Sequence, residues 1–83
     1  MSGAAVLESV RRVLADVLGL DPAELGPESS PDTVAAWDSV QHLNAIIALE
    51  QEFGMRFSPE EIEEAVSVAA IVELIDRKRP RSG

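Results

Sequence analysis

The sequence predicts an all-α fold, a small four-helix bundle with one short helix and one long loop. Three observations lead to this prediction. Apolar residues recur at helical spacing in several stretches, glycine and proline separate these stretches, and no segment alternates apolar and polar residues long enough to form a strand. A chain of 83 residues has room for one domain, and we therefore expect residues 1–83 to form a single domain.

The first helix is expected at about residues 4–18, where an apolar stripe faces the core and Gly19 ends the helix. The stripe consists of Val6, Val10, Val13, Leu14 and Val17. A long connection follows over residues 20–37. Within it, Asp21, Pro22 and Glu24 have the spacing of a capping box with proline at the first helical position, which predicts one helical turn.

The second helix is expected at about residues 39–53, before Gly54, and two stripes can be traced along it, of which the first is apolar. At about 100° per residue, the core stripe contains Leu43, Ile46, Leu49 and Phe53. The second stripe, on the far side, contains Val40, Asn44, Ile47 and Gln51, next to Glu50. Exposed aliphatic residues are ordinary on protein surfaces, but a four-helix body offers no second core for Val40 and Ile47. We therefore predict that this stripe is a docking ridge for partner proteins.

A short third helix is expected at about residues 59–65, because Ser58, Pro59 and Glu61 form a capping box with proline at the first helical position. The fourth helix is expected at about residues 68–79, capped by Ser67 and closed by Pro80. The basic tail of residues 77–83 suits a helix C-terminus followed by a frayed end, rather than a binding element.

Charge and composition exclude several classes of function. The formal net charge is −8, and between Asp38 and Asp76 nine acidic residues accompany a single basic one, Arg56. Such a surface repels nucleic acid and anionic lipid and attracts proteins with basic docking patches, although solubility alone also explains it. The chain has no cysteine, no apolar run near ~20 residues and no basic segment before its first apolar residues. We therefore expect a cytoplasmic protein that does not insert into membranes.

Ser39 differs from the other serines whose roles can be assigned from the sequence. Capping positions or terminal and outward-facing positions account for Ser58, Ser67, Ser30, Ser2, Ser82 and Ser9. If Asp38 caps the second helix, with Gln41 as its reciprocal partner, Ser39 occupies the first helical position with an exposed hydroxyl near the positive end of the helix dipole. The alternative, in which Ser39 itself is the cap, fits the spacing equally well.

Catalysis and metal binding have little support in the sequence. A nucleophilic serine needs a base, and the only histidine is His42, three residues after Ser39, with no third group to orient it. We expect His42 to be a packed or half-exposed residue. One histidine and no cysteine argue against zinc, and the glutamates of the third helix lack the spacing of a calcium loop.

The run from Trp37 to Gly54 resembles the second helix of acyl carrier proteins, whose signature is Asp-Ser-Leu before an apolar-rich helix ending in Leu-Glu-x-Glu-Phe. Residues 57–62 resemble their third helix, and residues 67–68 resemble the start of their fourth. The resemblance covers nearly the whole chain in the order and length of the family. The chain departs from the usual pattern at Val40, Trp37, Asn44 and Gln51, the last two being acidic in the housekeeping fatty-acid carrier.

The resemblance implies an acyl-carrier-protein-like bundle that carries covalent 4′-phosphopantetheine on Ser39, beside Asp38, and is not an enzyme. A separate phosphopantetheinyl transferase would transfer the arm from coenzyme A with magnesium, and the arm would hold an acyl group as a thioester. Its thiol would explain why the chain needs no cysteine.

The form Trp37-Asp38-Ser39, with His42 and Leu43 soon after, is similar to free-standing carriers of specialised pathways, such as polyketide, other secondary-metabolite or lipid biosynthesis. The expected partners are the transferase and acyl-loading, synthase or acyltransferase enzymes with basic docking patches. They would recognise a monomeric carrier through Val40, Asn44, Ile47, Glu50 and Gln51.

Two alternatives stay open. The first is an amino-acid carrier of the peptidyl or D-alanyl type, but peptidyl carriers usually place glycines just before the serine, where this chain has Trp37 and Asp38. The second is a helical interaction module without the arm, against which the intact Asp38-Ser39 pair argues.

Overall fold

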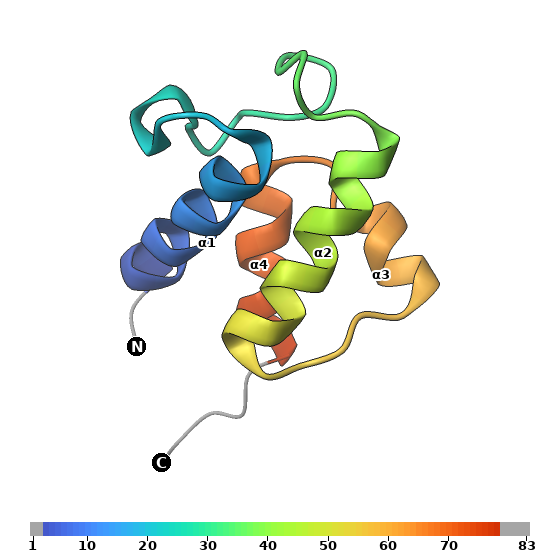
Figure 1. The fold of residues 1–83 in the computed structure, drawn as a ribbon. Coiled ribbons are helices and arrows are strands. Elements are labelled where there is room, and N and C mark those ends of the chain that lie inside the picture. Colours follow the sequence, from blue (N-terminus) through green and yellow to red (C-terminus); the bar gives the residue numbers. More distant parts are fainter. Residues whose placement is uncertain (1–2, 79–83) are drawn as a thin grey trace.

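The computed structural model describes residues 3–78, which form four α-helices and one short 3-10 helix (Figure 1). The elements are α1 (Gly3–Leu18), η1 (Pro22–Glu24), α2 (Ser39–Phe53), α3 (Pro59–Glu64) and α4 (Val68–Lys78). The predicted four-helix bundle with a long loop and a short third helix is confirmed, and η1 is the predicted helical turn. The predictions for residues 79–83, most of the basic tail, lie outside the described residues.

The short elements begin at the predicted caps. The side chain of Asp21 accepts a hydrogen bond from the N–H of Ala23, and Glu24 completes the capping box of η1. At α3, Ser58 Oγ accepts from the N–H of Glu61 at 3.2 Å, and Glu61 Oε1 accepts from the N–H of Ser58 at 2.8 Å. Since each cap satisfies N–H groups that have no partner within the helix, local sequence alone fixes where these helices start.

The third helix ends one residue earlier than predicted. Ala65 is its C-cap, with φ −80° and ψ 64°, and its N–H donates to the carbonyl of Ile62 at 3.3 Å. This tighter turn leads the chain out of α3 and into α4. Ser67 caps α4 as predicted, since its Oγ accepts from the N–H of Ala70 at 3.1 Å.

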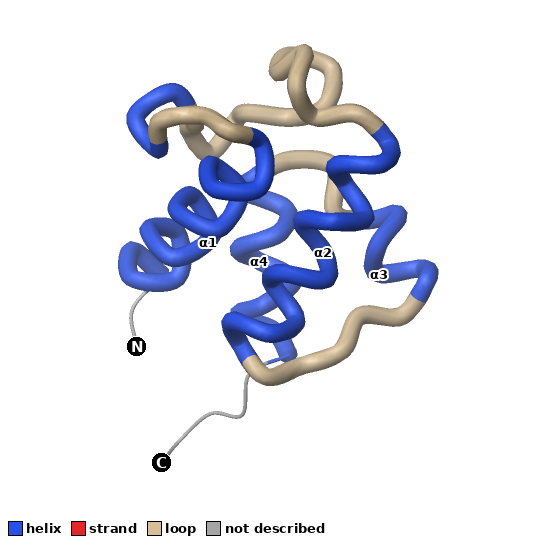
Figure 2. Tube along the Cα trace, viewed as in Figure 1, coloured by secondary structure: helices blue, strands red, loops and turns tan. Residues whose placement is uncertain are grey.

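The core lies between α1, α2 and α4, and α1 packs against both other helices. The predicted stripe of α1 is confirmed, with Val6, Val10 and Leu14 buried and Val13 and Val17 half-buried against them. The core also includes Ala45, Ile46 and Leu49 of α2 and Val68, Ile71, Leu74 and Ile75 of α4. Figure 2 shows α3 at the edge of the bundle, where it packs against α4.

The predicted core stripe of α2 is wrong at one position. Leu43 is 55% exposed, whereas Ala45 is 1% exposed and takes a place in the core. The physical reason is the direction of the buried face, which is centred near Leu49. Leu43 lies about 120° from Leu49 around the helix axis. Neither α1 nor the short α3 covers that side.

The long loop crosses one end of the bundle and is tied to both helices beneath it (Figure 1). The carbonyls of Ser29 and Pro27 accept from the N–H groups of Val68 and Ala69, at 2.9 and 2.8 Å, and so satisfy the first turn of α4. The guanidinium of Arg11 donates to the carbonyls of Leu25 and Pro22 at 2.8 and 2.9 Å. These bonds fix the path of the loop toward the start of α2.

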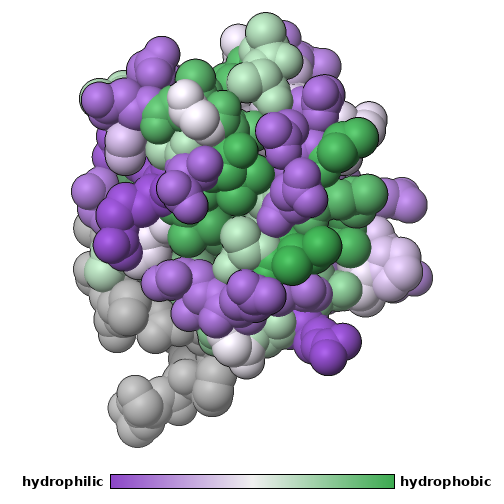
Figure 3. All heavy atoms as spheres, viewed as in Figure 1, coloured by the Kyte–Doolittle hydropathy of each residue, from purple (hydrophilic) through white to green (hydrophobic). Residues whose placement is uncertain are grey.

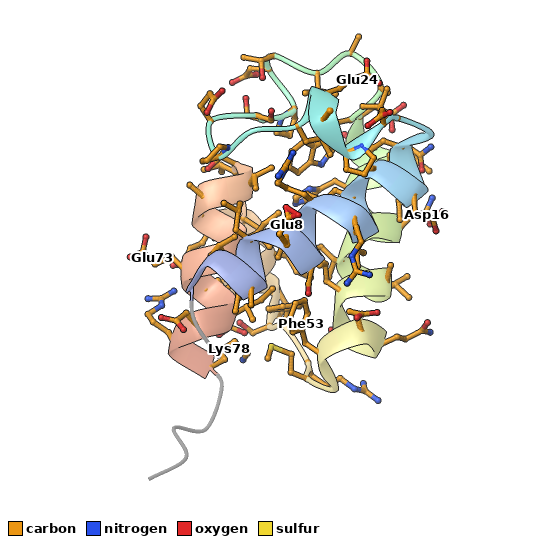
Figure 4. The ribbon with its side chains drawn as sticks, turned by 90° about the vertical axis from the view of Figure 1, so that its left-hand side faces the viewer. Glu8, Asp16, Glu24, Phe53, Glu73 and Lys78 are labelled. Atoms are coloured by element: carbon orange, nitrogen blue, oxygen red, sulfur yellow. The ribbon has the colours of Figure 1, made fainter. Side chains whose placement is uncertain are left out.

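Acidic residues are exposed on several elements of the bundle. Figure 4 shows carboxylates distributed over α1, η1 and α4, where the exposed acidic residues include Glu8, Asp16, Glu24 and Glu73. Among residues 3–78, the helices are all too short or too polar to cross a bilayer.

Candidate functional site

The start of α2 presents an exposed serine hydroxyl. Asp38 is the N-cap, with an extended backbone, and its Oδ1 accepts from the N–H of Gln41 at 2.9 Å. Ser39 is therefore the first helical residue, and the alternative in which Ser39 is the cap is wrong. The side chain of Ser39 is exposed and forms no hydrogen bond with the other described residues. The predicted reciprocal bond from Gln41 is absent from this part of the chain, because Gln41 Oε1 accepts from Asn44 Nδ2 at 3.0 Å instead.

Trp37, the residue before this cap, lies in the core. Its side chain is 1% exposed, and its Nε1 donates to Nδ1 of His42 at 3.0 Å. The indole and imidazole rings lie 5.9 Å apart between centroids. The sequence alone assigned no structural role to Trp37. Trp37 precedes the cap and His42 is the fourth helical residue, and these are the two positions that meet in a hydrophobic staple.

His42 joins α2 to α3. An indole N–H can only donate, so Nδ1 of His42 accepts, and the neutral ring carries its proton on Nε2. Nε2 lies 3.3 Å from the carbonyl oxygen of Ile62 and donates to it. The prediction of a packed or half-exposed histidine is confirmed. Because Trp37 and Ile62 occupy both ring nitrogens, His42 has no nitrogen left to act as a base for Ser39.

The position of α3 depends on a second bridge. Lys78 Nζ at the end of α4 lies 2.9 Å from Glu61 Oε1 in the first turn of α3. The hydrogen bond from the backbone of Ser58, and then the bond from Lys78, hold the pKa of Glu61 below its ordinary value of 4.5. The ammonium of Lys78 also lies 5.7 Å from the ring centroid of Phe57. Glu61 therefore belongs to the framework that supports Ile62 and, through it, His42.

An open groove of about 520 Å³ lies beside the Ser39 hydroxyl. It is lined by Pro31, Trp37, Asp38, Ser39, His42 and Leu43. A phosphate ester at Ser39 fits this groove, because the hydroxyl is not hydrogen-bonded to the other described residues and the space beside it is open. The N-terminus of the 15-residue helix also favours negative charge. The residues at the start of α2 thus suit a phosphate-linked group attached to Ser39.

Four of the five residues of the predicted docking ridge share the outer face of α2. Val40 and Ile47 are 68% and 53% exposed, and Asn44 and Gln51 are exposed as well. Glu50 differs, because it is half-buried and its Oε2 accepts from the N–H of Phe57 at 2.9 Å. The carboxylate of Glu50 is thus engaged in holding the connection between α2 and α3.

Leu43 belongs to this exposed face but was assigned to the core from the sequence. Its position on the helix lies between the two predicted stripes, about 60° from Val40. This angle was the only sequence signal for its exposure. No three acidic, histidine or cysteine side chains within residues 3–78 come together as a possible metal site.

Comparison with known proteins assigns the family. Residues 8–75 match the family described as "Phosphopantetheine attachment site". The chain is 35% identical over 78 residues to an acyl carrier protein of Thermosynechococcus vestitus, covering 94% of this chain and 96% of that protein. It is 39% identical over 70 residues to an acyl carrier protein of Clostridium acetobutylicum, covering 84% and 91% of the two chains.

A solved structure has the same fold. The solution NMR structure of the holo acyl carrier protein from Geobacter metallireducens superimposes with a TM-score of 0.79 at 29% identity, covering 88% of this chain and 84% of that one. The family match extends from α1 into α4 and includes the groove at the start of α2. The chain therefore belongs to the acyl carrier protein family, whose members have a phosphopantetheine attachment site.

Proposed function

We propose that Ser39 is the residue of this acyl carrier protein to which 4′-phosphopantetheine is attached. One observation carries the proposal: Asp38 caps α2, which leaves the Ser39 hydroxyl exposed and uncommitted at the first helical position. Proteins of this family carry acyl groups and do not catalyse their conversion. The task of this chain is accordingly to be modified, to be recognised and to present its cargo.

The other described serines are less suited to attachment. Ser58 and Ser67 accept hydrogen bonds from backbone N–H groups as helix caps. Ser29 is 8% exposed, and its Oγ accepts from the N–H of Gly26. Ser9 is half-buried inside α1, away from the helix ends.

Ser30 is also less suited, although the predicted capping role of its side chain is wrong. Thr33 Oγ1 accepts from the N–H of Ser30 at 3.0 Å, and the residues that follow form a turn rather than a helix. The Ser30 hydroxyl lies 3.5 Å from Thr33 Oγ1. It therefore has neither the free surroundings nor the helix terminus that Ser39 has.

The chemistry of attachment needs little from this chain beyond the hydroxyl. A phosphopantetheinyl transferase joins Ser39 Oγ to the phosphorus of coenzyme A, the pyrophosphate bond breaks, adenosine 3′,5′-bisphosphate leaves, and the transferase removes the hydroxyl proton. When attached, the arm supplies the thiol that holds an acyl group as a thioester, and the chain itself has no cysteine. The N–H of Val40, the second residue of α2, has no partner within the helix. A negative group near such a helix N-terminus is stabilised by about 0.3–1 kcal/mol.

We further propose that the carrier serves a specialised biosynthetic pathway. Support comes from the outer face of α2, where Asn44 and Gln51 are neutral amides. Acyl-loading, synthase or acyltransferase enzymes with basic patches would meet the acidic α3 instead, where Glu60 and Glu63 are exposed. The single carrier domain over residues 1–83, its monomeric state and its cytoplasmic location stay predictions.

The attachment is tested by intact-protein mass spectrometry. The protein is incubated with coenzyme A, magnesium and a phosphopantetheinyl transferase of broad carrier specificity. We expect wild type and Ser58→Ala to gain the mass of one phosphopantetheine group and Ser39→Ala to gain none. A gain that persists in Ser39→Ala would assign the attachment to another residue, and no gain in the folded wild type would contradict the carrier function.

A further inference from the structure

One hydrogen bond joins the single tryptophan of the chain to its single histidine. Trp37 Nε1 donates to Nδ1 of His42 at 3.0 Å, and the two rings are inclined to each other by 32°. The side chain of Trp37 is 1% exposed, so the donor of this bond is buried. Because an indole N–H can only donate, the bond exists only while Nδ1 of His42 carries no proton.

Protonation of His42 breaks this bond and leaves the other bond of the ring in place. In an imidazolium ion both nitrogens carry a proton, so Nδ1 changes from an acceptor into a donor and meets the N–H of Trp37. Nε2 already donates to the carbonyl of Ile62 and continues to do so. The added proton therefore separates the ring of His42 from the loop before Ser39, but not from α3.

The groove beside Ser39 offers the released indole no buried side-chain acceptor. Both rings line this groove together with Pro31 and Leu43, whose side chains contain no polar atom. Figure 3 shows hydrophobic surface on the side of the molecule that carries α2 and α3. The lining residues that remain, Asp38 and Ser39, are exposed. Because an unsatisfied buried donor is costly, the indole must move toward these exposed groups or toward water.

The contacts on either side of Trp37 limit how far this movement extends. Toward the N-terminus, the carbonyl of Ser29 is bonded to the N–H of Val68 in α4. Toward the C-terminus, Asp38 caps α2 through the N–H of Gln41, a bond in which the side chain of His42 takes no part. Release of the indole therefore affects residues 30–37 and leaves the start of α2 in place.

The charged residues around the pair are all acidic. His42 contacts the loop through Trp37 and α3 through Ile62. The acidic residues on α3, in the loop and at the cap that adjoin these contacts or the groove in sequence are Asp32, Asp38, Glu61 and Glu63. Glu61 is paired with Lys78, whereas the other three are exposed. Since α2, α3 and the long loop contain no lysine or arginine, no basic side chain of these elements opposes a positive charge on the ring.

From these contacts we propose that Trp37 and His42 form a pH-sensitive latch on the loop that precedes Ser39. While Nδ1 of His42 is unprotonated, the latch is closed and the indole stays in the core. Protonation opens the latch, releases residues 30–37 from α2 and changes the walls of the groove beside Ser39, while the helices keep their places. Histidine is the side chain that ordinarily changes charge between about pH 5 and 8, and this chain has one histidine and no cysteine.

An NMR titration of the ¹⁵N-labelled, unmodified protein from about pH 8 to about pH 5 tests the latch. The Nδ1 resonance of His42 reports its protonation, and the Hε1 resonance of Trp37 reports the hydrogen bond of the indole. We expect Hε1 to move upfield with the same midpoint as Nδ1. The amide resonance of Ala70, whose capping bond lies outside the latch, should change little, and circular dichroism should show constant helicity.

Two variants serve as controls. In His42→Gln the amide oxygen can accept from the indole, but the side chain does not titrate, so Hε1 should keep its position over the whole pH range. Glu61→Gln removes a carboxyl group whose pKa is lowered by the backbone of Ser58 and by Lys78, and which adjoins Ile62. The transition of Hε1 should persist in this second variant.

Several results would overturn the latch. An Hε1 resonance that keeps its position while Nδ1 becomes protonated shows that protonation does not break the bond, and an Nδ1 that stays unprotonated down to about pH 5 shows that no latch operates in this range. A loss of helicity with the same midpoint assigns the change to unfolding, and a transition that persists in His42→Gln assigns it to another group. Because the protein is unmodified throughout, none of these results depends on the attachment at Ser39.

Discussion

The indole Nε1 of Trp37 donates to Nδ1 of His42 at 3.0 Å, and His42 passes the connection on to the carbonyl of Ile62. Through these two bonds, the loop before Ser39, the first turn of α2 and the short α3 are held together. The site thus depends on contacts that lie outside the Ser39 hydroxyl itself.

Replacing His42 tests this connection. In His42→Ala the buried Nε1 of Trp37 loses its acceptor, and an unsatisfied buried donor costs about 1–3 kcal/mol of unfolding free energy. Urea unfolding followed by the fluorescence of Trp37, the single tryptophan, measures the loss. In His42→Gln the amide oxygen can accept in place of Nδ1, and we expect part of the stability to return. Equal stabilities of His42→Ala and wild type would show that the bond contributes nothing.

The helix starts could be predicted because their causes are local. Asp38, Ser58 and Asp21 each cap a helix within three residues of their own position, so sequence spacing contains the whole geometry. Ser39 could be placed at the first helical position for the same reason. The sequence left open whether Asp38 or Ser39 is the cap, and only the bond from the N–H of Gln41 to Asp38 Oδ1 decides between them.

Other features could not be predicted because they depend on tertiary packing. Leu43 is exposed since no neighbouring helix covers its side of α2, and Glu50 is engaged because the connection after α2 brings the N–H of Phe57 to it. Neither the length of α3 nor the path of that connection follows from the periodicity of α2. The burial of Trp37 could not be predicted either, because it depends on the path of the long loop. That loop is attached to α4 through the carbonyls of Pro27 and Ser29.

The exposure of Leu43 predicts an asymmetry between two leucines of one helix. Leu43→Ser should change the free energy of unfolding by no more than about 0.5 kcal/mol, as is usual for surface positions. Leu49→Ala should cost about 2–5 kcal/mol, because Leu49 is fully buried. Chemical denaturation of the two variants measures both free energies. A loss of unfolding free energy in Leu43→Ser comparable to that in Leu49→Ala would show that Leu43 is a core residue after all.

The capping box of α3 predicts a separate effect on stability. Ser58→Ala removes the acceptor for the N–H of Glu61 and should cost about 1 kcal/mol. Thermal unfolding measures the loss. Ser58→Asp provides the control, since an aspartate at this position can also cap and should keep most of the stability.

Glu61 predicts a dependence of stability on pH. Its pKa is lowered in the folded protein by the Ser58 N–H and by Lys78, so the carboxylate contributes stability that is fully present above 4.5, its ordinary pKa, and is lost as pH falls through the lowered pKa. Wild type should thus have a higher Tm than Glu61→Gln at neutral pH, and the difference should shrink in acid. A difference that is constant with pH would contradict this assignment.

The central claim concerns one atom, the Oγ of Ser39, and fragmentation mass spectrometry of the modified wild type tests it most directly. Trypsin releases residues 13–56 as one peptide, which contains Ser29, Ser30 and Ser39. After incubation with coenzyme A and the transferase, the fragments should place one phosphopantetheine group on Ser39 and leave Ser29 and Ser30 unmodified. Fragments that place the group on any other residue would contradict the claim.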